Sequence, residues 1–332
     1  MYDVRFDNST FSIFQLFNLK SLLQNKIAES EVTLPVCALT AVALWWLPER
    51  TFSIGNLLGL VLCLLTTYIV METNTRYHII RIRTRMMSCV WLVLTVCLSF
   101  MHPLDAPLIA AGFLCSSYHL LFRSYQRHRP QLIVFHAFLM LGLGSFFAPV
   151  MLLMAIPFYL YLFFFLRSLT WKGFWAGMLG LIVPYWCYGA WNLLIHNTVL
   201  DFQATDYSLF TLSPIQFFTL SPIHLFNCAV IALLSIVSIV HYLRTNYDDK
   251  IRVRMILYIY VWQTLLLMAF LVLQPEHYQT TLALIVASAS PLIAHFFALS
   301  KSIPTTIFFL LSLLLTSALA VLNLWTTSFS IS

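Results

Sequence analysis

Long apolar runs, separated by short polar segments, extend along most of the chain. Many of these runs hold about 20 residues, the length that an α-helix needs to cross the roughly 30 Å hydrocarbon core of a bilayer. The runs are bounded by charged residues or by Pro and Gly, and they predict eleven transmembrane helices. We expect these helices near residues 32–48, 52–71, 86–102, 105–122, 131–147, 149–166, 174–196, 222–242, 255–273, 280–299 and 304–325.

The apolar run from Gln131 to Leu166 decides the helix count. A single helix of that length would extend about 54 Å, well beyond the bilayer core. We therefore expect the chain to fold back within this run. Gly142, Gly144 and Pro149 mark the position of the turn.

The composition agrees with a membrane-embedded bundle. Hydrophobic residues make up 61% of the 332 residues and charged residues only 9%, whereas soluble domains carry about 25% charged residues. We predict an all-α fold, a polytopic transmembrane helix bundle, with residues 31–332 as a single transmembrane domain. Residues 1–30 are expected to form a cytoplasmic or interfacial segment, with a partner-binding element as the alternative. An outer loop with a short interfacial helix is expected at 197–221.

The distribution of positive charge predicts the orientation of the bundle. If the N-terminus is cytoplasmic, seventeen of the eighteen Lys and Arg residues fall on the inner side and only Arg50 lies outside. This asymmetry is the one that the positive-inside rule describes. With eleven helices, the C-terminus is then expected on the outer side.

The inner segment RYHIIRIRTR places Arg76, Arg81, Arg83 and Arg85 among apolar residues. Its positive charge is first of all a topological signal. It could also bind anionic headgroups or a pyrophosphate, since each such charge contributes about 1 kcal/mol near an anionic surface. We take the four arginines as candidate lipid-phosphate-binding residues. Nucleic acid is not an expected partner, because no RNA- or DNA-binding signature accompanies the charge.

The expected spans hold no acidic residue at their middle. Ion-coupled transporters usually keep a carboxylate there, so this activity is disfavoured. His136 and His295 lie well within spans, and His119 and His241 lie nearer the inner ends. A neutral imidazole making one interhelical hydrogen bond is the simplest interpretation, and a ligand or proton relay is the alternative. The spacing of His, Cys and acidic residues indicates neither a metal site nor a cofactor.

Candidate catalytic groups occur in the expected outer loops. His196, Asp201 and Asp206 belong to the loop after the seventh helix, and Glu49 lies in the tight turn LPERTF. Carboxylates near a histidine suit acid/base chemistry. A solvated loop surface is the alternative.

One part of the chain carries a resemblance to known families: LFRSYQRHRPQLIVFHAFLMLGLGSFFAPVMLLMAIPFYLYLFFFLRSLTWKGFWAGMLGLIVPYWCYGAWNLL (121–194). It has a basic turn, a Gly-rich hairpin with Ala-Pro, an aromatic helix ending in Arg, and a helix with Pro-Tyr and Trp-Asn. This order resembles an uncharacterised family of multi-pass inner-membrane proteins of Bacteroidota. It is more distantly similar to the central helices of C-type glycosyltransferases, which move sugars from polyprenyl carriers at the outer face.

The resemblance implies a protein of the bacterial inner (cytoplasmic) membrane that handles a lipid or a lipid-linked saccharide at the outer leaflet. Its expected partners are membrane lipids and a polyprenyl-linked sugar, and Glu49 would stand for the acidic residue of the family. The long first outer loop of C-type glycosyltransferases is absent, because LPERTF is a tight turn. The alternatives are a non-catalytic scaffold or accessory subunit of a membrane complex, and an uncoupled lipid transporter.

The stretch TLSPIQFFTLSPIHLF (211–226) repeats eight residues almost unchanged. Ser-Pro is typical of a helix start, with Ser as N-cap and Pro at the first helical position. We expect Ser221-Pro222 to begin the eighth span and Ser213-Pro214 to open a short interfacial helix.

Overall fold

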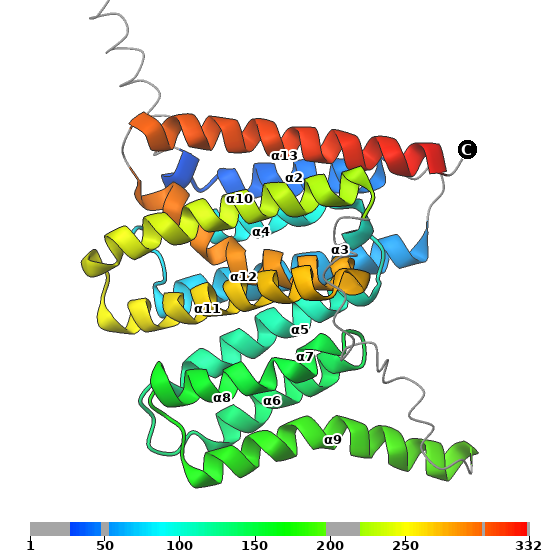
Figure 1. The fold of residues 1–332 in the computed structure, drawn as a ribbon, viewed down its shortest axis with the longest axis vertical. Helices are drawn as coiled ribbons and strands as arrows, with labels where there is room; N and C mark the ends of the chain where they lie inside the picture. The colour runs from blue at the N-terminus through cyan, green and yellow to red at the C-terminus, as the bar shows by residue number, and fades with distance from the viewer. Residues whose placement is uncertain (1–26, 48–52, 197–219, 301–302, 331–332) are drawn as a thin grey trace, which may run out of the picture.

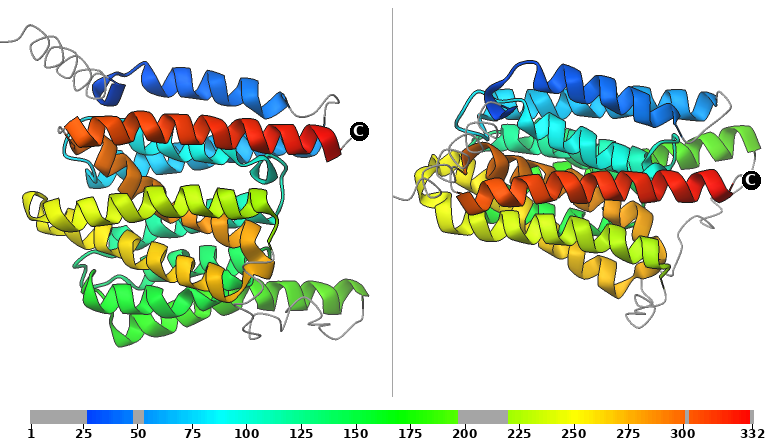
Figure 2. Two further views of the ribbon diagram at one scale, coloured as in Figure 1. Left: turned by 45° about the horizontal axis from the view of Figure 1, so that its top comes forward. Right: turned by 90° about the horizontal axis from the view of Figure 1, so that it is seen from above.

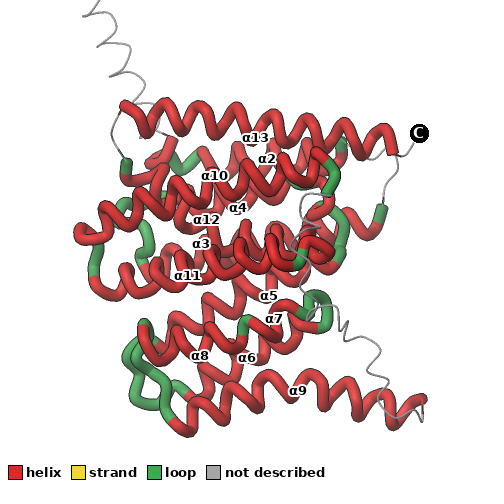
Figure 3. Tube along the Cα trace, viewed as in Figure 1, coloured by secondary structure: helices red, strands yellow, loops and turns green. Residues whose placement is uncertain are grey.

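The computed structural model describes residues 27–47, 53–196, 220–300 and 303–330, without the side chains of residues 195–196, 303 and 326–330. Within these ranges all regular structure is helical (Figures 1 and 3). The helices are α2 (Thr33–Trp46), α3 (Ile54–Tyr77), α4 (Met86–Cys97), α5 (Ala106–Leu121), α6 (Gln131–Ser145), α7 (Val150–Leu153), α8 (Ala155–Phe164), α9 (Trp171–His196), α10 (Pro222–Thr245), α11 (Ile251–Leu273), α12 (Tyr278–Leu299) and α13 (Ile303–Ser330). Short 3-10 turns η1 (Ser99–Met101), η2 (Phe122–Ser124), η6 (Asn246–Asp248) and η7 (Pro275–His277) join some of them.

The all-α prediction is confirmed for the described residues. Each of the eleven expected ranges contains helix, and the sixth is divided into α7 and α8. The chain turns between α6 and α7, where the glycines and Pro149 predict it. Five described helices are long and apolar enough to cross a membrane: Ile54–Tyr77, Pro222–Asp248, Ile251–Leu273, Pro275–Leu299 and Pro304–Trp325. These features are compatible with an integral membrane protein.

Helix α12 forms the centre of the bundle, in contact with α4, α5, α10 and α11 (Figure 1). Nearly all of its residues are buried, and many are Ala or Ser, which allow neighbouring helices to approach closely. Pro291 lies inside this helix and deprives the Ala287 carbonyl of its amide donor. The Ser290 hydroxyl lies 3.5 Å from that carbonyl, as expected where a side chain compensates for a proline in a buried helix.

Glycine residues bring α6 and α9 together at the edge of the bundle. A Cβ on Gly180 would overlap the carbonyl oxygen of Phe135, and a Cβ on Gly142 would lie 3.0 Å from the Leu181 carbonyl oxygen. Both positions therefore allow backbone to approach backbone, the packing that small residues permit between membrane helices.

An asparagine pair links α10, α13 and α4 inside the apolar bundle. The Asn323 amide donates to the Asn227 side-chain oxygen at 3.0 Å and to the Cys97 carbonyl at 3.1 Å. Both asparagines are buried. Polar side chains of this kind connect helices in an environment where water cannot replace the lost hydrogen bonds.

Successive long helices run in alternating directions, so the loops gather at two ends of the bundle (Figure 1). One end carries the connections 78–85, 122–130, 165–170 and 246–250, and we call it the basic end. Every Lys and Arg of the described ranges lies in these connections or in the helical turns beside them. The charge asymmetry noted in the sequence is therefore also an asymmetry in space.

The second Ser-Pro pair begins a helix as expected. Helix α10 starts at Pro222 and Ser221 is its N-cap residue, although the Ser221 side chain makes no capping hydrogen bond. Ser213-Pro214 and the expected interfacial helix lie outside the described residues, as do residues 1–26.

Candidate phosphate-binding site at the basic end

The connection between α3 and α4 carries three of the four candidate arginines, and its shape is set by Asn74. The Asn74 side chain accepts a hydrogen bond from the Ile80 amide at 3.2 Å and donates one to the Thr84 carbonyl at 2.9 Å. His78, with φ of 50°, ends α3 in the left-handed region, and Ile80 is buried. The loop is therefore tied to the bundle at both of its ends.

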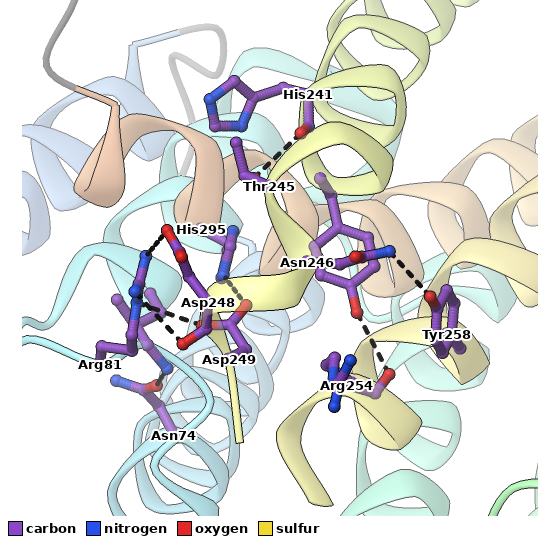
Figure 4. Close-up of polar contacts among 12 residues, drawn as sticks. Asn74, Arg81, His241, Thr245, Asn246, Asp248, Asp249, Arg254, Tyr258 and His295 are labelled. Carbon is purple, nitrogen blue, oxygen red and sulfur yellow. Dashed lines mark hydrogen bonds and ion pairs between the residues drawn. The ribbon is translucent and has the colours of Figure 1, made fainter. Parts of the chain in front are cut away.

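Arg81 is held by a buried acidic residue of a distant connection (Figure 4). Its Nε lies 3.2 Å from Oδ1 of Asp249, whose side chain is 0% exposed, while the Arg81 side chain is 41% exposed. A second carboxylate, that of the 44% exposed Asp248, lies 3.6 Å from Arg81. Residues 81 and 249 thus join the α3–α4 loop to the α10–α11 loop.

Asp249 also has a partner in the central helix. Nε2 of His295, on α12, donates to Oδ2 of Asp249 at 3.0 Å, and the imidazole is 1% exposed. The Tyr242 ring meets the His295 ring edge to face, with the ring centres 5.5 Å apart. His295 makes a hydrogen bond, but not the predicted interhelical one, because its partner is a loop carboxylate, that of Asp249.

Further polar contacts fix the α10–α11 loop around this pair (Figure 4). The Asn246 amide donates to the Tyr258 hydroxyl at 2.8 Å, and the Tyr242 hydroxyl donates to the Arg254 carbonyl at 3.2 Å. The ends of α10 and α11 are thereby connected. This support gives Asp249, and through it Arg81, a defined position.

A pocket of about 650 Å³ opens beside the arginine loop. It lies between the segment before α2, the last turns of α3, the loop itself and the first turn of α4. Its charged lining residues are Glu29, Glu31, Glu72, Arg81, Arg83 and Arg85, with His78, Asn74, Thr75 and Ser88 among the polar ones. A polar, concave site with convergent charged groups is typical of ligand binding.

The structure separates the four arginines by role. Arg81 is engaged by two carboxylates and acts as an anchor of the loop. Arg83 pairs with Glu31 at 3.6 Å, but both side chains are largely exposed, at 95% and 73%, and such a pair contributes little and exchanges readily. Arg85 makes no ion pair within the described ranges. Arg83 and Arg85 are therefore the groups that a ligand in the pocket can engage.

Arg76 does not line this pocket and belongs to a neighbouring surface. It lies beside Tyr77, whose phenol experiences the charges of Arg76, Arg123, Arg252 and Arg127. The Arg252 guanidinium lies 5.3 Å from the centre of the Tyr77 ring, in the geometry of a cation–π contact. The four candidate arginines therefore lie on two different surfaces, Arg76 on one and the other three on the pocket wall.

Of the candidate catalytic residues, only the backbone of His196 is described, at the end of the bundle opposite the basic end. Glu49, Asp201 and Asp206 are outside the described residues, and His196 is the last residue of α9, with its side chain also undescribed. No described geometry brings these four groups together.

A histidine at that same end has a structural role. The His102 ring stacks on Trp45 with centres 4.4 Å apart, and its Nε2 donates to the Val96 carbonyl at 2.9 Å. His102 therefore holds the connection between α4 and α5.

Asp248 and Asp249 were not recognised in the sequence as part of a site. Part of their signal was available, because two adjacent acidic residues follow one span and His295 lies within another. Nothing in the sequence, however, indicates which loop carboxylate reaches which helix.

The fold and this site together define a class: a helical bundle, compatible with an integral membrane protein, with a charged pocket at its basic end. No family model, no curated protein and no solved structure matches the chain.

Proposed function

We propose that the protein is an integral membrane protein that binds the phosphate group of a lipid or lipid-linked saccharide in the pocket between α3 and α4. The observation that carries this proposal is the pocket of about 650 Å³ with Arg83 and Arg85 on its wall. Guanidinium groups suit phosphate because their planar donors form paired hydrogen bonds with its oxygens.

The loop that carries these arginines is pre-organised for binding. Asn74 fixes its backbone, and Asp249 fixes Arg81 within it. A site of defined shape loses less conformational entropy when the ligand arrives than a disordered loop would. The acidic lining residues Glu29, Glu31 and Glu72 favour a headgroup that carries a hydrogen-bond donor beside its phosphate.

We further propose that the chain crosses the bacterial inner membrane about eleven times, with its N-terminus inside, its C-terminus outside and the basic end facing the cytoplasm. The alternating helix directions and the gathering of Lys and Arg at one end support this topology. Helix α4 has 12 residues and extends only about 18 Å, so its crossing must include the adjoining turns.

Sugar transfer at the outer leaflet stays a prediction from the resemblance. Its candidate residues Glu49, Asp201, Asp206 and His196 have no described geometry that supports it. The phosphate site at the basic end does not depend on that chemistry, since it would serve a transporter or a lipid-regulated subunit equally well.

The test is lipid binding to the purified, delipidated protein, followed by native mass spectrometry. Phosphatidic acid and a polyprenyl phosphate are the two phosphate-bearing probes, and diacylglycerol is the neutral one. The double variant Arg83→Gln/Arg85→Gln is expected to weaken binding of the phosphate probes about thirtyfold, from about 1 kcal/mol for each lost charge. The affinities of the two phosphate-bearing probes are then compared, and the tighter-binding probe shows whether the site prefers a phospholipid or a polyprenyl carrier.

A matched control is Arg127→Gln/Arg129→Gln, which removes the same charge from the α5–α6 connection, outside the pocket. This variant is expected to bind as the wild type does. Equal weakening by both double variants would refute the site, because it would show only a general effect of positive charge. Stoichiometric protein partners without phosphate-lipid binding would instead favour the scaffold alternative.

A further inference from the structure

An apolar crevice lies on the other side of the segments that form the charged pocket. Its volume is about 100 Å³, and it is lined by residues of α2, α4, α10, α12 and α13. Among them are Cys37, Cys89, Val93, Phe309 and Leu313. Helices α2 and α13 both pack on α4 (Figure 2), and the crevice lies between them.

The crevice and the pocket share the same two stretches of chain. In the first, Ile27 and Thr33 line the crevice and residues 29–31 line the pocket. In the second, Met86, Cys89 and Val90 line the crevice, whereas Arg85 and Ser88 line the pocket. At 100° per residue these two groups occupy adjacent faces of the first turns of α4.

The crevice is accessible from the surface of the bundle. Leu313 on its wall is 46% exposed, in contrast to Phe309, which is buried. The surface around it belongs to the apolar helix α13, one of the helices long enough to span a membrane. A hydrocarbon chain of the surrounding lipid could therefore enter the crevice laterally, from within the membrane.

We propose that the crevice holds one hydrocarbon chain of the lipid whose phosphate binds beside Arg83 and Arg85. This inference rests on the proposed function and specifies its ligand class, an amphiphile bound at both its charged and its apolar part. The polar pocket and the apolar crevice match the two parts of such a molecule, and their shared walls place the two parts next to each other.

The hydrocarbon chain is expected to strengthen binding through its fit to the crevice rather than through the removal of apolar surface from water. A hydrocarbon chain gains little by leaving lipid for an apolar crevice, because lipid tails are equally apolar. It gains dispersion contacts with a close-packed wall. A larger side chain that fills the crevice is therefore expected to exclude the hydrocarbon chain of the lipid without changing the charge of the pocket.

The experiment uses a phosphatidic acid with a photoreactive diazirine in one acyl chain, in phosphatidylcholine nanodiscs that contain the full-length protein. Labelled residues are located by mass spectrometry. In the wild type, label is expected at 86–94 of α4 and 309–316 of α13. Leu313→Trp is expected to reduce this label about tenfold, the effect of an overpacked site.

The neighbouring Leu314→Trp is the matched control. Leu314 is 64% exposed and does not line the crevice, so this variant is expected to keep the label. Val93→Trp fills the crevice from α4 and provides a second test if Leu313→Trp folds poorly. Melting temperatures of all variants report on folding.

The outcomes separate this inference from the proposed function. Label spread over exposed residues such as Leu314, and unchanged by Leu313→Trp, would overturn the inference. If Arg83→Gln/Arg85→Gln still weakened phosphate binding in that case, the phosphate site would stand alone. If that double variant had no effect on binding, the proposed function and this inference would both fail. A protein segment that fills the crevice, detected as a protein–protein crosslink at Val93, would also contradict the inference that a hydrocarbon chain occupies it.

Discussion

Among the residues of the basic end, Asp249 is the one whose replacement we expect to lower the free energy of unfolding most. Asp249→Asn keeps the size of the side chain and removes its charge. The carboxylate is 0% exposed, hydrogen-bonded to His295 at 3.0 Å and ion-paired with Arg81 at 3.2 Å. We expect the free energy of unfolding to fall by about 2 kcal/mol, in the range of a lost charge-assisted hydrogen bond.

The estimate is below the 3–5 kcal/mol found when a fully buried pair loses one partner. Arg81 is 41% exposed and keeps both water and Asp248 as partners, so its charge stays solvated and paired. Most of the loss is expected from the buried His295 side, where the acceptor becomes weaker.

Asp248→Asn is the matched control, because it makes the same change one residue earlier. Its side chain is 44% exposed and lies 3.6 Å from Arg81, so the expected cost is below about 1 kcal/mol. Both variants would be unfolded reversibly in sodium dodecyl sulfate and followed by tryptophan fluorescence. An effect of Asp248→Asn as large as that of Asp249→Asn would refute the buried-anchor interpretation.

Two further predictions concern the rest of the bundle. Asn323→Leu removes the donor to the Cys97 carbonyl and should lower stability by about 1 kcal/mol in the same detergent titration; no change would contradict a structural role for the bond. Gly180→Ala should lower the melting temperature by separating α6 and α9, whereas Gly55→Ala, whose Cβ would meet only a side-chain atom at 3.5 Å, should not.

The helices could be predicted from the sequence because membrane helices are encoded by local apolar runs. The fold-back between α6 and α7 follows from length alone, since no single helix of that length fits a bilayer. The start of α10 follows from Ser221-Pro222, although its capping bond does not form. The division of the sixth range into α7 and α8 falls just before Pro157, which has no amide to donate to the Leu153 carbonyl.

The site was harder to predict because its contacts join distant segments. The arginines of segment 76–85 were interpreted first as a topological signal and also as candidate phosphate-binding residues, but the role of each arginine depends on the residues that it contacts. Arg81 meets Asp249, a residue 168 positions further along the chain, and Arg76 turns to the surface around Tyr77. Hydrophobic periodicity carries no information about such pairings, which follow from the packing of α4 and α10 around α12.

The most direct measurement is an experimental structure of the protein in nanodiscs that contain phosphatidic acid. We predict a phosphate group within about 3 Å of the Arg83 and Arg85 guanidinium groups, the length of a charge-assisted hydrogen bond, inside the pocket between α3 and α4. A pocket that holds only water, with phosphate bound instead around Arg76 and Arg252 or nowhere on the basic end, would contradict the central claim.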